Sequence, residues 1–251
     1  MLAELREADA PPEVDAIYAQ LRQAYGLPMV NLIWRHFATL PGVLPWAWES
    51  IAPATPLLPA ATARLMAALE PLPRISMGPD AAGIAALYNR GNLSNLILLT
   101  ALLRGPQRGA TAPAAGPAPA GPPPAMLPKP PPLPRLEALS PEARRSVLAL
   151  AGLHGHAEGI IPTLYLHLAH WPALLTPLYM ALSPLFGMGR IAELRRKALE
   201  AASREADAMR PHLAAPPPPP PEALEAARAV LTPFTGQVIA DMVPIGLMIG
   251  R

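Results

Sequence analysis

The chain has 251 residues, of which 51% are hydrophobic and 15% charged, with a formal net charge of +2. This composition provides for a sizeable core, and the charges are too few and scattered for a nucleic-acid-binding surface. Without cysteine, the chain has no disulfide, thiolate chemistry or cysteine metal site. Aromatic residues make up only 5% and most apolar residues are Ala and Leu, so we predict an all-α fold. The 37 prolines are expected between helices or in their first turns.

The first part of the chain contains a distinctive aromatic block. Its opening, MLAELREADAPPEVD, lacks the apolar centre of a signal peptide, which predicts a cytoplasmic protein. The helix predicted at PEVDAIYAQLRQAYG is followed by Ile33–Pro53, a block of helix, Pro, short turn, helix and Pro. Val30, Ile33, Trp34 and Phe37 recur at helical spacing in and just before this block. Trp34 and Phe37 are therefore predicted to lie on one face.

Three asparagines interrupt the apolar run LYNRGNLSNLILL further along. Asparagine is a poor helix former that prefers caps and turns. We therefore predict that Asn92 is a helix N-cap with a structural role. Asn95 then falls in the first turn, where its amide can reach into an interior.

The second part of the chain repeats the first. Leu164–Pro184 aligns with Ile33–Pro53 at a constant offset of 131 residues, without a gap. The matched pairs include His36 with His167, Trp34 with Tyr165, and Pro41 with Pro172. We predict two tandem pseudo-symmetric helical repeats, packed as an intramolecular pseudo-dimer.

These matches divide the chain into three segments. The first repeat spans residues 1–104, a Pro/Ala-rich linker spans 105–136, and the second repeat spans 137–251 with a proline-rich insertion at 211–221. The linker is expected to be an extended, polyproline-like connector. A ligand for proline-binding modules is the alternative interpretation. We favour a spacer, since only its length matters to the fold.

The stretch from Gly159 to Arg190 has no charge before Arg190 and is long enough to suggest a transmembrane helix. Four prolines divide it into pieces shorter than a spanning helix. These are Pro162, Pro172, Pro177 and Pro184. We therefore predict buried core helices and no membrane association.

Ordinary cofactor and metal motifs are absent from the sequence. It has no Gly-rich phosphate loop, no G-x-S-x-G elbow and no H-E-x-x-H. His36 and His167 occupy equivalent positions, but no further ligands cluster near them. We predict neither a metal nor a cofactor.

Three runs together resemble the group I 2-haloacid dehalogenases, which act on both enantiomers. They are LPMVNLIWRHFATLPGVLPWAWESIAP, YNRGNLSNLILLTALL and IPTLYLHLAHWPALLTPLYMALSPL. The resemblance implies an all-helical chain of two related halves with the active site between them. It also implies hydrolysis of a 2-halocarboxylate to a 2-hydroxycarboxylate, in which an aspartate activates water and no covalent intermediate forms.

The resemblance also suggests site residues. Trp34 and Phe37 match the family's aromatic wall, and Asn95 is the best match to its pocket asparagine. The further candidates for substrate binding are Thr163, Tyr165 and Arg35.

The family's aspartate is expected near the start of the helix in the second repeat. There this chain reads HAEGIIPTLYLHLAHWP, which contains no Asp. Glu158 is the nearest acid, and Asp241 is another acid in apolar surroundings. These two are the candidate bases.

Two functions follow from these observations. The first is a 2-haloacid dehalogenase-family hydrolase that uses Glu158 or Asp241 as base. The second is a non-catalytic relative that binds a small carboxylate or an apolar ligand between the repeats. An interaction protein that uses its proline tracts ranks below both, and a homodimer is left open.

Overall fold

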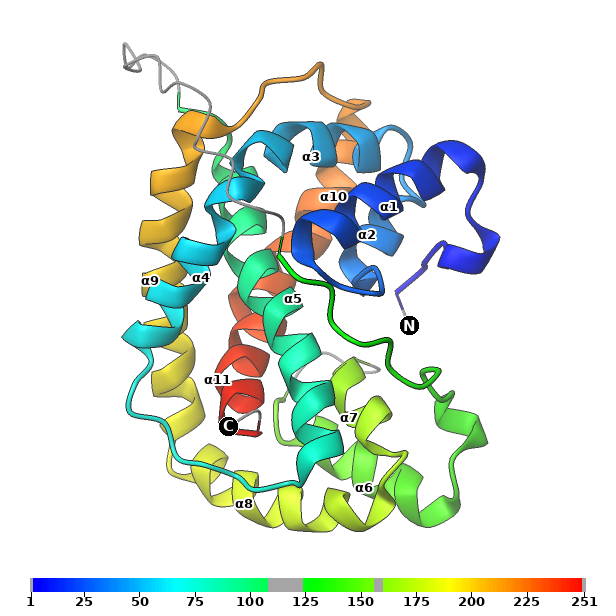
Figure 1. Ribbon diagram of the computed structural model, residues 1–251, viewed down its shortest axis with the longest axis vertical. Helices are drawn as coiled ribbons and strands as arrows, with labels where there is room; N and C mark the ends of the chain where they lie inside the picture. The colour runs from blue at the N-terminus through cyan, green and yellow to red at the C-terminus, as the bar shows by residue number, and fades with distance from the viewer. Residues whose placement is uncertain (1, 108–123, 156–159, 250–251) are drawn as a thin grey trace.

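The computed structural model describes residues 2–107, 124–155 and 160–249, which form helices, turns and extended segments with no strand among them. The predicted all-α class is confirmed. The helices in the first part of the chain (Figure 1) are η1 (Glu7–Asp9), α1 (Pro12–Tyr25), α2 (Leu32–Phe37), α3 (Val43–Ile51), η2 (Ala52–Leu57), α4 (Leu58–Ala68) and α5 (Pro79–Arg104). Those in the second part are η3 (Leu136–Ala138), α6 (Pro141–Gly152), α7 (Thr163–Leu168), η4 (Pro172–Leu174), α8 (Leu175–Gly187), α9 (Arg190–Met209), η5 (Arg210–His212), α10 (Pro221–Pro233), the π-helical η6 (Phe234–Ile239) and α11 (Ala240–Ile249).

Proline begins several helices, as the composition predicts. The helices α1, α5, α6 and α10 start at Pro12, Pro79, Pro141 and Pro221. A missing N–H costs nothing in the first turn, because that group has no partner within the helix. The prediction is incomplete, since four prolines lie inside helices. These are Pro56, Pro184, Pro233 and Pro244.

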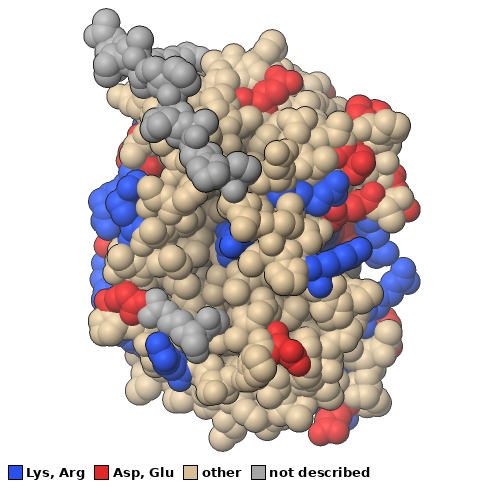
Figure 2. All heavy atoms as spheres, in the orientation of Figure 1, with Lys and Arg blue, Asp and Glu red and all other residues tan. Residues whose placement is uncertain are grey.

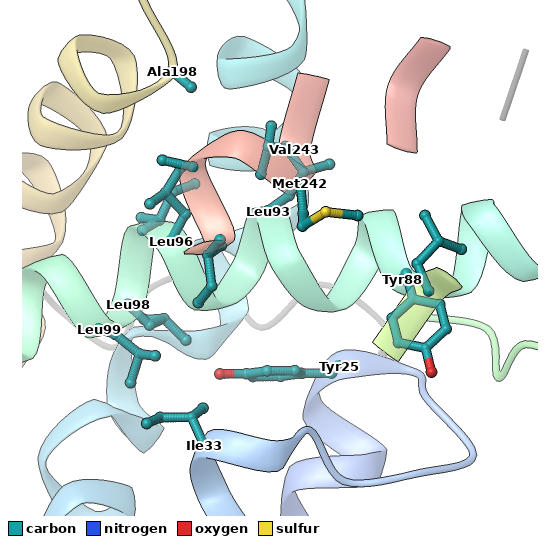
Figure 3. Close-up of a cluster of buried hydrophobic side chains, with 14 of the residues drawn as sticks. Tyr25, Ile33, Tyr88, Leu93, Leu96, Leu98, Leu99, Ala198, Met242 and Val243 are labelled. Carbon is teal, nitrogen blue, oxygen red and sulfur yellow. The ribbon is translucent and has the colours of Figure 1, made fainter. Parts of the chain in front are cut away.

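Helix α5 is the central helix of the fold. It packs against α9 and α11 from the second part of the chain, and Figure 1 shows both running beside it. In Figure 3, Tyr25 and Ile33 lie on one side of α5, and Met242 and Val243 lie on the other. Buried side chains from both parts of the chain therefore form one continuous hydrophobic core.

Two glycines allow other helices to approach α5 closely. A Cβ atom added at Gly246 in α11 would lie 2.0 Å from Oδ1 of Asn89 in α5. A Cβ atom added at Gly91 in α5 would lie 2.8 Å from Nδ2 of Asn31, the residue before α2. The absence of a side chain at these positions sets the distance between the helices.

Residues 124–134, which we call the linker strap, are held against the helices by hydrogen bonds. Near the start of the strap, the Arg90 guanidinium donates to the carbonyl oxygen of Ala125. Near its end, two imidazole Nε2 atoms bond to strap carbonyls: His167 to Pro131 at 2.9 Å and His170 to Pro132 at 2.8 Å. This part of the predicted linker therefore packs on both α5 and α7.

One continuous helix among the described residues, from Pro221 to Ile249, is long and apolar enough by composition to cross a membrane. Of its most apolar window, 61% is buried inside the protein, as in the core helix of a soluble protein. In the described part of the stretch predicted to form buried core helices, residues 160–190, helix α7 is largely buried, whereas α8 buries only one side. On α8 and just after it, Met180 is 67% exposed and Met188 is 73% exposed, because only one side of this helix packs on the core.

The bounds of α2 and α7 differ by the same 131 residues as the two sequence blocks. The duplicated block therefore forms a six-residue helix at the same position in each half. The duplication of the whole units, residues 1–104 and 137–251, stays a prediction.

Candidate functional site

A small cavity of about 50 Å³ lies between helices from the two parts of the chain. Its polar lining residues are Asn31 before α2, Tyr88, Asn92 and Asn95 on α5, and Thr163 at the start of α7. The other lining residues are apolar and come from α2, α7, η6, α11 and the residue before α7. Among the residues that the structure describes, the lining thus offers amide and hydroxyl groups but no carboxylate, imidazole or cationic side chain.

Asn95 is held in place by Trp34. The indole Nε1 of Trp34 donates to Oδ1 of Asn95 at 2.9 Å, and the two side chains are each 1% exposed. Indole N–H is only a donor, so the Asn95 oxygen accepts and its NH₂ group is directed elsewhere. Phe37 packs edge-on against Trp34 with a ring centroid distance of 5.7 Å. The predicted residues Trp34 and Phe37 therefore support the cavity from behind Asn95 and do not line it.

Tyr88 connects the cavity to the linker strap. Its hydroxyl lies 2.5 Å from Nδ1 of His167, and Nε2 of the same imidazole lies 2.9 Å from the carbonyl oxygen of Pro131. Burial lowers the pKa of His167, an effect that the bond to Pro131 opposes and the neighbouring His170 reinforces. The imidazole is therefore neutral near pH 7 and links the phenol to the strap.

Thr163 and Tyr88 meet at the cavity wall. Burial raises the pKa of the Tyr88 phenol above its ordinary value, while the positive charge of Arg35 and a hydrogen bond from Thr163 act in the opposite direction. The phenol stays protonated at neutral pH. Thr163 lies at the start of α7, where the resemblance leads us to expect an aspartate, and it supplies a hydroxyl in place of a carboxylate.

Asp241 belongs to a buried network. Its carboxylate is fully buried and lies 3.1 Å from Nη1 of Arg195 and 3.3 Å from Nδ1 of His154. The other imidazole nitrogen lies 2.8 Å from the Tyr165 hydroxyl. Burial and the nearby Asp241 charge both raise the pKa of Tyr165. The network therefore joins α7, α9, α11 and the turn after α6 through hydrogen-bonded polar groups.

This network places two predicted site residues together but not in the cavity wall. Val238 and Met242 line the cavity, whereas Asp241 and Tyr165 are not among its lining residues. Both are fully buried. Asp241 is one of the two candidate bases, but its carboxylate faces Arg195 on α9, because a buried carboxylate needs a charge partner.

Arg35 points to the N-terminal segment. Its Nη2 lies 2.8 Å from a carboxylate oxygen of Glu4, and its Nη1 donates to the carbonyl oxygen of Val30. It is not among the residues that line the cavity. Its contribution to the cavity is therefore the electrostatic effect on Tyr88 and not a direct contact.

The sequence analysis missed the cavity contacts of Tyr88, Asn92 and Asn31. Asn92 was expected at a helix N-cap, but α5 begins at Pro79 and Asn92 lies well inside it. A usable signal was present, because Tyr88, Asn92 and Asn95 stand at i, i+4 and i+7 on one face of an apolar helix. The candidate base Glu158 lies outside the described residues.

A second, larger depression of about 450 Å³ is open to the surface beside the start of α5. Its polar lining residues are Asp80 and His170, and Trp171 forms part of the wall. In the part of the chain that the structure describes, no three His, Cys, Asp or Glu side chains are grouped so that they could hold a metal ion.

No protein-family model matches the sequence, and none of the curated proteins matches it. Among solved structures, a D-2-haloacid dehalogenase mutant in complex with D-2-CPA is 17% identical, with a TM-score of 0.70 over 99% of this chain and 96% of that one. A second D-2-haloacid dehalogenase mutant is 16% identical, with a TM-score of 0.71 over 99% and 96% of the two chains. A D-2-haloacid dehalogenase with L-LA is 19% identical, with a TM-score of 0.68 over 100% and 94%.

These likenesses cover nearly the whole of each chain, at identities that establish a shared fold and nothing finer. The resemblance drawn from the sequence is confirmed at this level. The chain has the fold of the 2-haloacid dehalogenases.

Proposed function

We propose that this chain binds a small 2-substituted carboxylate in the cavity between α2, α5, α7 and η6, without hydrolysing it. The observation that carries the proposal is the lining itself. Its described residues offer amide and hydroxyl groups but no side chain that can act as a base near pH 7. Binding of the carboxylate needs only the amide and hydroxyl groups. Attack by water on the carbon atom needs a base in addition.

The cavity suits a small anion. The amides of Asn92 and Asn95 supply donors, and Trp34 fixes the orientation of the second of these. Arg35 adds a positive charge whose influence reaches Tyr88 at the cavity wall. The apolar remainder of the lining suits the methyl group of a three-carbon acid.

Two measurements on the purified protein test this proposal. Thermal unfolding in the presence of R- and S-2-chloropropionate is expected to show ligand-dependent stabilisation, because a ligand that binds only the folded state stabilises it. Halide release from the same compounds is expected to be absent. A matched Trp34→Phe variant keeps the ring but removes the donor to Asn95, and its affinity should fall about tenfold.

Hydrolysis is the second candidate function, and the fold shared with D-2-haloacid dehalogenases favours it. It requires a base that is not among the described lining residues, for which Asp241 and Glu158, the latter outside the described residues, are the candidates. Halide release by the wild-type protein would contradict binding without turnover. Loss of that release in Glu158→Gln or in Asp241→Asn would then identify the base.

A gain-of-function variant sharpens the distinction. Thr163 and Leu164 both line the cavity from the first turn of α7. Thr163→Asp and Leu164→Asp, tested separately, each introduce a carboxylate beside the bound acid. Halide release that appears only in one of these variants would mean that the cavity is complete except for the base.

The remaining expectations from the sequence concern where the protein is located and which macromolecules it binds. We infer a cytoplasmic protein that binds neither nucleic acid nor membrane. On the face shown in Figure 2, Lys and Arg are interspersed with Asp and Glu and do not form a basic patch. A homodimer stays a prediction, which sedimentation of the purified chain would test.

A further inference from the structure

We propose that the outward face of α8 is the surface through which two copies of this chain associate, antiparallel about a two-fold axis. The face consists of every third or fourth residue of η4 and α8, and we call it the α8 seam. Its members are Ala173, Pro177, Met180, Pro184 and Gly187. This inference goes beyond the binding of a small carboxylate and does not rest on it.

The α8 seam is exposed although its sequence has the composition of a core. Residues 172–189 contain no charged side chain, whereas the outward face of a surface helix is ordinarily charged or polar. Leu175, Leu178 and Leu182 pack inward, while the whole seam is exposed, with Met180 at 67%. Figure 1 shows α8 at the lower edge of the molecule with no helix beyond it. An exposed Met in surroundings without charge is typical of the centre of a protein–protein interface.

The spacing of the α8 seam is that of two helices packed along their length. Successive members stand four, three, four and three residues apart, which is a repeat of 3.5 residues. In an antiparallel pair centred on this seam, Met180 of one copy meets Met180 of the other on the axis. Pro177 then lies opposite Pro184, and at the ends of the seam Ala173 lies opposite Gly187. A surface that matches itself in this way is what a two-fold contact requires.

A protruding side chain and a depression lie at equal distances from the centre of the seam. Met188 is 73% exposed and stands eight residues after Met180, and Pro172 stands eight residues before it. Pro172 and Trp171 line the depression of about 450 Å³ beside the start of α5. In the antiparallel pair, Met188 of each copy therefore enters the depression of the other, where its sulfur can contact the Trp171 ring. Both depressions are then filled, so the dimer is closed and does not extend into a filament.

The absence of charge favours a second copy of this chain as the occupant. Near a two-fold axis each side chain meets its own kind, so a charge there would face an equal charge. Four of the five seam residues are Ala, Gly or Pro, which lose no side-chain entropy when they are buried. A membrane surface is less suitable, because helices that lie on membranes present Trp, Phe or Leu, and the seam contains none of these.

The size of the seam predicts a weak dimer. The face from Pro172 to Met188 is about 25 Å long and about 10 Å wide, an outline of about 250 Å² per copy. The accessible surface exceeds this outline, and the walls of the depression add to it. The pair therefore belongs to the small interfaces, below about 1,200 Å² in total, that form transient complexes. We expect a dissociation constant in the micromolar range.

Sedimentation equilibrium of the purified chain over a range of micromolar concentrations tests the association. The average mass should rise from that of one chain toward that of two and no further. A chain that stays monomeric, whether or not it binds phosphatidylcholine vesicles, would overturn the proposal.

Two charge variants at the centre of the seam test the two-fold axis. Met180→Glu and Met180→Lys each place like charges opposite one another, so the dissociation constant of each should rise at least about tenfold. Mixed in equal amounts, they bring opposite charges together and should associate more tightly than either variant alone. Met126→Glu is the matched control, since Met126 is 55% exposed on the linker strap, and its association should equal that of the wild type. A mixture that associates no better than its components would refute the position of Met180 on the axis.

Disulfide formation tests the antiparallel order, because the chain has no cysteine of its own. Ala173→Cys and Gly187→Cys should form a cross-linked dimer when the two variants are mixed under mild oxidation, since these positions lie opposite each other in the pair. Each variant alone should cross-link far more slowly. Both positions are exposed, and a Cβ atom at Gly187 meets nothing within 4 Å, so both variants should fold. Cross-linking of Ala173→Cys with itself at the rate of the mixture would show a parallel pair and overturn the proposal.

Discussion

At the scale of residues, one group of polar side chains deep in the core is held together by partners distant in sequence. Asp241, Arg195, His154 and Tyr165 form a buried network around a fully buried carboxylate. An ion in a low-dielectric interior is tolerated only when a countercharge and hydrogen bonds replace its water. This requirement explains why an acid stands in the apolar run QVIADMVP.

Asp241→Ala is expected to destabilise the protein strongly. It leaves Arg195 and His154 without their shared carboxylate, and breaking a buried pair costs about 3–5 kcal/mol of unfolding free energy. Urea unfolding measures the loss. The control is Asp207→Ala, which removes an exposed ion pair with Arg104 and should cost no more than about 1 kcal/mol. Equal losses in the two variants would contradict the role given to burial.

Stability should also depend on the protonation of His167. Burial lowers its pKa in the folded state, so the unfolded chain binds the proton more readily. The unfolding free energy is therefore expected to be highest above the ordinary histidine pKa of about 6.5 and to fall as the pH drops below it. Urea unfolding between pH 8 and pH 5 measures this slope.

His167→Gln, which cannot titrate in this range, is the comparison for that slope. Between pH 8 and pH 5, the unfolding free energy of this variant should fall less steeply than that of the wild type. The decrease that remains is due to other titrating groups. An unchanged slope would mean that His167 does not titrate differently in the folded and unfolded states.

At the scale of elements, the environment of α5 sets the fold. It is a 26-residue helix that meets α2 on one side and α11 on another. The sequence analysis predicted a helix N-cap at Asn92, because asparagine prefers caps and turns. Helix α5 instead begins at Pro79 and continues without a break through Gly91 and Asn92. Gly91 is needed where Asn31 approaches, a contact that local sequence does not reveal.

Gly246→Ala should disrupt the contact between α5 and α11. Its Cβ atom would lie 2.0 Å from Oδ1 of Asn89, which is buried and has little room to move. Overpacking of this kind costs about 1–3 kcal/mol of unfolding free energy. In Gly83→Ala the new Cβ meets nothing within 4 Å, and the variant should gain about 0.4–1 kcal/mol.

A double variant checks the cause of that loss. Adding Asn89→Ala to Gly246→Ala removes the atom in conflict, so the two changes should be less harmful together than the sum of their separate effects. Strict additivity in urea unfolding would show that Asn89 is not the obstacle.

At the scale of the whole molecule, the two parts of the chain share one core. Helix α5 belongs to the first predicted repeat, yet it packs against α9 and α11 of the second. Each part alone would expose the apolar side chains that the other covers. The predicted boundaries at residues 104 and 137 therefore do not separate independent cores.

Fragments spanning residues 1–107 and 124–251 test this interdependence. Neither is expected to unfold cooperatively alone, because the buried face of α5 or of α11 would meet water. Mixed in equal amounts, they should associate and recover a cooperative thermal transition, followed by circular dichroism. A cooperative transition in either fragment alone would show a self-sufficient domain.

The sequence by itself determined the all-helical class and the likeness to the 2-haloacid dehalogenases. These depend on composition, helical spacing and a resemblance that can be read along the chain. The tertiary structure alone decided that Asp241 pairs with Arg195, that Arg35 turns to Glu4, and that Tyr88 meets His167 under the linker strap. These three contacts have the same physical basis. A buried polar group takes whichever partner the packing of helices brings within reach, and in these cases that partner lies dozens of residues away.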